Sequence, residues 1–332
     1  MRKTALLCST AVLTALLFAV SSFAQDATTA RASRPNDPPT VPITTVVTAL
    51  GPNFTAALVI SKDDIAVYSN NTRINVASFE PARGAKAGMQ LALLIDDDVS
   101  PTALGSHFSE IKSFIQAQPP TTEVAIYYAQ SGTVRAAAEF SSDHQAVAKK
   151  LRVPLGKFAG ASPSVYLSLK SLVDRWPHND MRHEVVMIAS GVDRLHPGLQ
   201  DPYLDQAIEH VQKAGVIVNT IYTGGFRLAQ SMVLQQNAWR NLSQVATDSG
   251  GQQFFQGFET PVNFMPIFHK LNIQFGNQYL LTADMPQPSK GKGQFKPIRI
   301  RTEQRNVHLS YAPQLWVRGP NSEPISNAKS GS

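Results

Sequence analysis

Cysteine is almost absent from this chain of 332 residues. The single one, Cys8, lies in the apolar N-terminal segment, so the remainder of the chain has neither a disulfide nor a thiol. Its stability must therefore come from an ordinary hydrophobic core. A chain of about 300 residues can supply such a core in one or two domains.

Long apolar runs are also missing beyond the N-terminus. Arg2 and Lys3 precede an apolar run from Ala5 to Val20, and small residues surround position 24. This is the pattern of a cleavable secretory signal over residues 1–24. No later stretch reaches the roughly 18 apolar residues of a membrane span. We therefore expect a periplasmic or extracellular protein without a transmembrane helix once the signal is removed.

A strong charge of one sign is lacking as well. Removing Arg2 and Lys3 from the 30 basic side chains leaves 28 against 24 acidic ones, with no long single-sign run. A dispersed surplus of this size is typical of a solvated surface. No basic stripe interleaved with aromatic residues is present, so we expect no nucleic-acid partner.

The chain divides by composition. Residues 25–41 and 319–332 are small, polar and proline-rich, which indicates a flexible linker and a disordered tail. Residues 42–86 and 276–318 contain short β-like runs separated by turn residues, and we expect the two sets of strands to pack together.

Residues 87–275 alternate between strand and helix patterns. Apolar runs at 89–95, 122–129, 184–190 and 216–222 are suited to buried strands. Helices are predicted after the pairs Ser100-Pro101, Ser162-Pro163 and Asp201-Pro202, and again near 238–247 and 261–273. This alternation predicts an α/β fold with a mostly parallel sheet and helices on both faces.

Ligands of such a sheet bind where the strands end. Directly after the first buried strand come Asp96, Asp98 and Ser100, and alternate side chains of an extended segment point the same way. Ser162 can bring another hydroxyl from the next loop. Carboxylates and hydroxyls form an oxygen-only cluster that suits magnesium, manganese or calcium.

These residues resemble a known family. IDDDVS (95–100) is similar to the D-x-S-x-S signature of the von Willebrand factor A (VWA) domain, with Asp98 at the first serine. Ser162 stands at the place of the family's threonine, and Ser190 at the place of its second aspartate. Three further segments resemble exported bacterial proteins of the acidobacterial VWFA-related family, namely 63–80, 246–255 and 277–283.

The resemblance implies a Rossmann-like VWA domain that binds a divalent ion and leaves one coordination position open for a carboxylate of a protein partner. Because Ser190 removes one acid and Asp98 adds one, we hypothesise that the charge of the site is kept while its geometry is shifted. The resemblance thus implies a protein-binding or adhesive module with Asp96, Asp98, Ser100 and Ser162 as metal ligands, and not an enzyme.

Other interpretations stay open. Ser100 and Ser162 each precede a proline and can be helix N-caps. A VWA-like domain with a degenerate site can serve as a metal-independent scaffold. The pattern D-x-D-x-S also fits a haloacid-dehalogenase-like phosphatase, in which Asp96 would be the nucleophile and Asp98 the general acid. That reading lacks the later pair of acidic residues that completes the metal site.

Overall fold

The computed structural model describes residues 39–57, 59–156, 164–193, 195–196, 200–224 and 232–322. The expected signal (1–24), most of the expected linker and Ser162 lie outside these residues, as does the tail from residue 323. In the part of the chain that is described, no helix is long and apolar enough to cross a membrane.

A six-stranded sheet lies at the centre of the fold, with the strand order β10-β9-β8-β5-β6-β7. Five strands run parallel, and β7 pairs antiparallel with β6 at one edge. The strands are β5 (Met89–Asp96), β6 (Thr122–Gln130), β7 (Thr133–Ser141), β8 (Arg182–Ala189), β9 (Ile217–Tyr222) and β10 (Gln253–Phe254). Every residue of β5 is buried, as its unbroken apolar run predicts.

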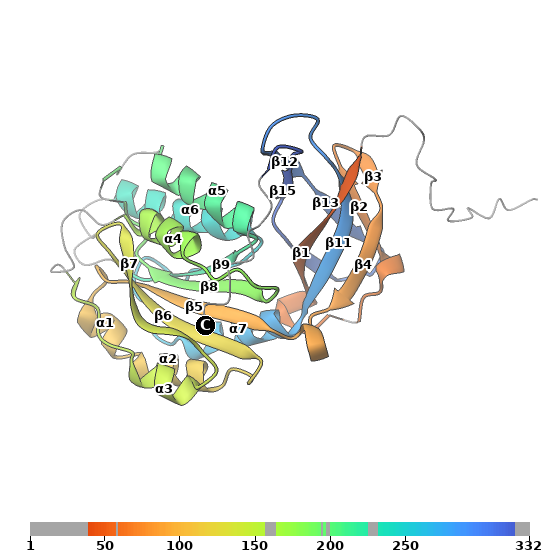
Figure 1. Ribbon diagram of the computed structural model, residues 1–332. Coiled ribbons are helices and arrows are strands. Elements are labelled where there is room, and N and C mark those ends of the chain that lie inside the picture. The colour runs from red at the N-terminus through yellow and green to blue at the C-terminus, as the bar shows by residue number, and fades with distance from the viewer. Residues whose placement is uncertain are drawn as a thin grey trace, which may run out of the picture. The chain divides into compact units, whose positions relative to one another are not determined.

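Helices cover both faces of this sheet (Figure 1). On one face lie α4 (Val165–Asp174), α5 (Pro202–Ala214) and α6 (Met232–Ser249). On the other lie α1 (Pro101–Gly105), α2 (Phe108–Gln116), α3 (His144–Lys149) and α7 (Met265–Gly276). The sheet is therefore the middle layer of an α/β sandwich, and the predicted α/β class is confirmed.

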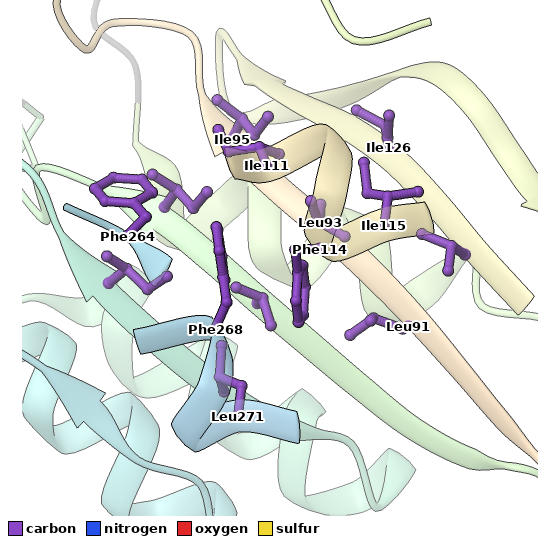
Figure 2. Packing of buried hydrophobic residues seen from close by; sticks show 14 of the residues in the cluster. Leu91, Leu93, Ile95, Ile111, Phe114, Ile115, Ile126, Phe264, Phe268 and Leu271 are labelled. Carbon is purple, nitrogen blue, oxygen red and sulfur yellow. The ribbon is translucent and has the colours of Figure 1, made fainter. Parts of the chain in front are cut away.

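Helices α2 and α7 pack against the central sheet through large apolar side chains. Figure 2 shows Phe114 of α2 and Phe268 of α7 side by side over Leu91 and Leu93 of β5. The two phenyl rings are stacked with centroids 4.4 Å apart, and both side chains are almost completely buried. Burial of large side chains on this scale is the main stabilising contribution to the fold.

Strands from the two ends of the chain pair with one another. β1 (Thr40–Leu50) lies between β11 (Gln278–Pro286) and β14 (His308–Ser310), and β4 (Val76–Pro81) pairs with β11. Two smaller sheets complete this β-rich part, and their strands are β13 (Arg299–Thr302), β2 (Ile65–Ser69), β3 (Thr72–Ile74), β12 (Gly293–Pro297) and β15 (Gln314–Arg318). The expected packing of the N-terminal and C-terminal strands is observed, with a shared apolar core.

Three short 3₁₀ turns interrupt the β-rich part and its exit toward β5. They are η1 (Pro52–Phe54), η2 (Lys62–Asp64) and η3 (Gly84–Lys86). The structure also adjusts three sequence-based boundaries. β1 already begins at Thr40, inside the segment expected to be a linker, and the first helix is divided at His107 into α1 and α2. Helix α4 is capped by Ser164 instead of starting at Ser162-Pro163.

A buried polar network connects the amino ends of the central strands to α7 and β11. Glu184 is fully buried in β8 and accepts hydrogen bonds from the side-chain amides of Asn219 (2.9 Å) and Gln278 (2.5 Å). Arg182, two residues earlier, donates to the carbonyl oxygens of Phe275 (3.1 Å) and Ala87 (2.9 Å) and to the Gln278 side chain. The network fixes the point at which the chain leaves α7 for β11.

Candidate functional site

The candidate site lies at the carboxyl edge of the sheet, where β5 and β8 end side by side. The chain leaves β5 toward β6 on one side, while β8 and β9 extend the sheet on the other. The strand order therefore reverses at this point. Doubly wound sheets bind ligands at such switch points.

Asp96, the last residue of β5, is the buried centre of this edge. Its side chain is only 3% exposed. One carboxylate oxygen accepts a hydrogen bond from the backbone N–H of Asp98 (3.0 Å), and the other accepts from the N–H (3.4 Å) and hydroxyl (3.2 Å) of Ser190. Burial raises the pKa of Asp96, although these donors oppose the shift. Ser190 thus joins the loop after β8 to the end of β5.

The next residue, Asp97, faces away from the site and anchors the following loop. Arg152 donates two hydrogen bonds of 2.8 Å to its carboxylate, and the backbone N–H of Leu155 donates a third (2.9 Å). The Arg152 guanidinium also lies 3.7 Å from the ring centre of Tyr128. This bidentate pair holds the segment 152–156 against the carboxyl edge, which explains why Asp97 is fully buried.

The other predicted ligands that the structure describes are less buried than Asp96. Asp98 and Ser100 are both partly buried in the loop after β5. Ser100 is the N-cap of α1, since its hydroxyl accepts from the N–H of Ala103 (3.3 Å). Asp96, Asp98 and Ser100 thus lie in one short segment, whereas the prediction for Ser162 falls outside the described residues.

Sequence reasoning missed the role of Ser164 and Asp193. Ser164 is the fully buried N-cap of α4, and its hydroxyl donates to Asp193 in the loop after β8 (2.5 Å). The N–H groups of Leu195 and His196 also donate to Asp193, at 2.7 and 3.1 Å. The pair Ser162-Pro163 predicts the helix start two residues too early, and the contact with Asp193 depends on the fold. The cue for Ser164 was its position just before the apolar stripe of α4.

A glycine permits the close approach of this loop to α6. Gly191 has φ +72°, and a Cβ atom there would lie 2.6 Å from Leu242 Cγ and 2.7 Å from the Ala238 carbonyl oxygen. The buried Tyr166 hydroxyl donates to the Gly191 carbonyl oxygen (2.7 Å). Burial and the nearby carboxylates Asp201, Asp193 and Asp96 raise the pKa of Tyr166 well above its usual value, so it stays a neutral donor.

The donors at the end of β5 match a divalent ion in chemistry but are already engaged within the protein. The side chains on the loop after β5 offer only oxygen, which is the chemistry that magnesium prefers. However, both oxygens of Asp96 already accept hydrogen bonds within the protein. Within the described ranges, no group of three or more His, Cys, Asp or Glu side chains is positioned to hold a metal. The described residues thus supply oxygen donors suited to such an ion, while the fourth predicted ligand, Ser162, lies outside them.

The strand order, the antiparallel edge strand and the helices on both faces define a doubly wound, Rossmann-like α/β fold. No family model and no curated protein matches the chain.

Among solved structures, the chain is similar to BatB from Bacteroides thetaiotaomicron, with 12% identity over 56% of this chain and 98% of that chain and a TM-score of 0.40. It is also similar to VWA2, a paralogue of ArnB from Sulfolobus acidocaldarius, with 11% identity, 83% and 76% coverage and a TM-score of 0.37. A third similar structure is the SpRpn10 VWA domain, with 12% identity, 57% and 97% coverage and a TM-score of 0.36. The fold assignment rests on the topology of this chain itself.

Proposed function

We propose that this chain is an exported binding module that engages a protein partner through the carboxyl edge of its central sheet. One observation carries the proposal. Of the eleven large apolar side chains that are exposed among the described residues, ten belong to the α/β part, where they lie in loops, in α6 or at the start of α7. They are Val153, Leu155, Leu195, Met232, Val233, Trp239, Phe255, Phe258, Val262 and Met265. Apolar groups gathered in this way are typical of an interaction surface.

Aromatic rings form the densest part of this surface. Phe255 lies 5.8 Å from Trp239 and 5.2 Å from Phe258, measured between ring centres, and each of the three is more than a third exposed. The rings of Phe255 and Phe258 pack on the buried Tyr222 at the end of β9. Clustered aromatic residues on a rigid support are the usual anchors of protein interfaces. The partner is therefore expected to present an apolar segment to this corner.

The arrangement of Asp96 favours binding over catalysis. As a phosphatase nucleophile it would need an accessible carboxylate oxygen, yet it is 3% exposed and accepts three hydrogen bonds from the protein. We therefore propose a binding role without enzymatic activity.

Replacing Val262 by aspartate is expected to abolish partner binding while leaving the fold intact. Val262 is 91% exposed, so the substitution changes the surface and not the core. The measurement is capture of envelope proteins from the source cells by immobilised mature protein, followed by identification of the bands that Val262→Asp loses. A partner so identified is then titrated against both proteins.

The matched control is Val59→Asp, because Val59 is 74% exposed but belongs to the β-rich part. It should bind like the parent. Equal loss of binding in both variants, or retention in both, would show that the carboxyl edge is not the interface.

A second candidate is divalent-ion-dependent binding, and the oxygen-only donors at the end of β5 favour it. Asp96, Asp98 and Ser100 would hold the ion together with Ser162, and the partner would contribute a carboxylate. When bound, the ion would supply an electrostatic link to that carboxylate.

Calorimetric titration with magnesium, manganese and calcium distinguishes the two candidates. If the site holds an ion, binding should disappear in Asp96→Ala and weaken in Asp98→Ser, since the latter removes one negative charge. The double change Asp98→Ser with Ser190→Asp should restore affinity, because Ser190 contacts Asp96 directly. No heat with the parent protein would leave metal-independent binding as the function.

A further inference from the structure

The fold gathers the basic residues, although they are dispersed along the sequence. Residues 39–86 and 278–322, which form the β-rich part, contain 11 Lys and Arg against 5 Asp and Glu. Residues 87–277 contain 14 basic against 16 acidic side chains. The positive surplus therefore belongs to the β-rich part.

Within the β-rich part, the sheet β13-β2-β3 concentrates three arginines on its outer face. Tyr68 in the middle strand pairs with Arg299 of β13 on one side and Arg73 of β3 on the other. Arg301 lies two residues further along β13, on the same face as Arg299. Directly opposite residues of antiparallel strands share a face, so the three arginines lie on the same face of the sheet as Tyr68.

The burial pattern confirms which face is outward. The neighbouring row, Ile300, Val67 and Ile74, is buried in the core of the β-rich part. Arg73, Arg299 and Arg301 are exposed, and Tyr68 is partly exposed. The guanidinium carbons of Arg299 and Arg301 lie 5.4 and 5.8 Å from the Tyr68 ring centre. Their guanidinium groups thus lie by one ring, although both residues remain exposed to solvent.

Among the described residues, none of these three arginines forms an ion pair with a carboxylate. The polar contact of Arg299 is a long one, 3.5 Å to the side-chain oxygen of Asn71. Like charges on neighbouring positions of a sheet repel each other. An anion placed between them would remove this repulsion and accept the paired N–H groups that arginine presents to carboxylates and phosphates.

We propose that this arginine face is a second binding surface and that its occupant is an acidic polysaccharide. Arg299 and Arg301 are about 7 Å apart along β13, and Arg73 lies across the sheet, two strand spacings or about 10 Å from Arg299. The three cations therefore form a triangular patch that the repeated anionic groups of an extended polyanion can span. Charge complementarity requires an anionic partner. A lipid surface is disfavoured because no large apolar side chain is exposed on the described part of this sheet.

The test uses mature protein and three probes, namely polygalacturonate, phosphatidylglycerol vesicles and duplex DNA, with neutral dextran as the blank. Polygalacturonate is expected to bind, and the triple variant Arg73→Gln, Arg299→Gln, Arg301→Gln should bind at least tenfold more weakly. The charge-matched control Lys112→Gln, Lys149→Gln, Lys150→Gln removes three cations from α2 and α3 and should retain binding. Thermal unfolding of each variant verifies that it is folded.

Two further outcomes decide the proposal. The triple exchange of the same arginines to lysine keeps the charge but loses the paired donors, and it should weaken binding to an intermediate degree. If the triple Arg→Gln variant and the triple Lys→Gln control lose binding to the same degree, net charge alone attracts the polysaccharide. That result would overturn the proposed site. Preference for vesicles or DNA over polygalacturonate would overturn the choice of partner.

Discussion

Replacing Arg182 by methionine is expected to lower the free energy of unfolding by about 3–5 kcal/mol at pH 8, because it leaves the buried carboxylate of Glu184 without a nearby cation. The substitution also removes the donors to the carbonyl oxygens of Phe275 and Ala87. Unpaired buried acceptors are costly at any pH. The measurement is denaturant unfolding at pH 5 and pH 8.

The loss should be smaller at pH 5 than at pH 8. Burial raises the pKa of Glu184 from 4.5 to about 7, while Gln278, Arg182 and Asn219 oppose the shift. At pH 5 the carboxyl is therefore protonated and neutral, and the missing cation matters less. At pH 8 the Arg182→Met variant must either keep the Glu184 carboxylate buried without a nearby cation or protonate it. An equal loss at both values would show that Arg182 acts only through its hydrogen bonds.

The sign of the wild-type contribution follows from the same shift. The pKa of Glu184 is higher in the folded protein than in the unfolded chain. Its protonation therefore contributes stability that is fully present below pH 4.5 and is lost as the pH rises through about 7. The total change is about 3 kcal/mol. It is best seen as the difference between parent and Glu184→Gln, because His183 titrates in the opposite sense, its pKa being lowered by burial to about 4. Arg135→Met, on the exposed side of β7, is the control for loss of an arginine.

Much of the fold follows from the sequence because its signals are local. The unbroken apolar run of β5 and the capped amphipathic helix after Asp201 specify their own structures. The edge strand β7 was not predicted, since its residues 133–141 alternate poorly and are mostly half exposed. β12 and β15 were missed for a similar reason. Each is stabilised by pairing with the other, between residues such as Gly293 and Arg318, and not by its own pattern.

The candidate site was predictable only in part. Strand-end position and alternation located Asp96, Asp98 and Ser100, because these depend on one segment. The bond from Ser190 to Asp96 joins residues 94 positions apart, and that from Ser164 to Asp193 joins residues 29 apart. Such contacts depend on how β5, β8 and α4 pack. The arginine face has the same origin, since Arg73 and Arg299 come to the same face only because β2 pairs with both β3 and β13.

Truncation of Phe268 to alanine is expected to destabilise the protein by about 3–5 kcal/mol, since it removes a large buried ring and leaves a cavity. Phe268 is 2% exposed, stacks on Phe114 and meets Phe264 edge to face at 5.7 Å (Figure 2). Phe268→Leu should lose less, because the branched side chain refills part of the space. Thermal and denaturant unfolding measure both changes.

Phe268→Ala should also increase the local mobility of the proposed binding surface, because α7 anchors the segment that follows β10. Glu110 of α2 accepts hydrogen bonds from the N–H groups of Phe264 (2.7 Å) and Met265 (3.0 Å), and the His107 ring stacks on Phe264. Loss of the ring at 268 weakens the contact between α2 and α7 on which these bonds depend. Hydrogen exchange at residues 255–265 should therefore accelerate in Phe268→Ala and stay unchanged in Met265→Ala, whose side chain is 48% exposed. Acceleration spread evenly over all strands would instead indicate global destabilisation without a specific link between α7 and the carboxyl edge.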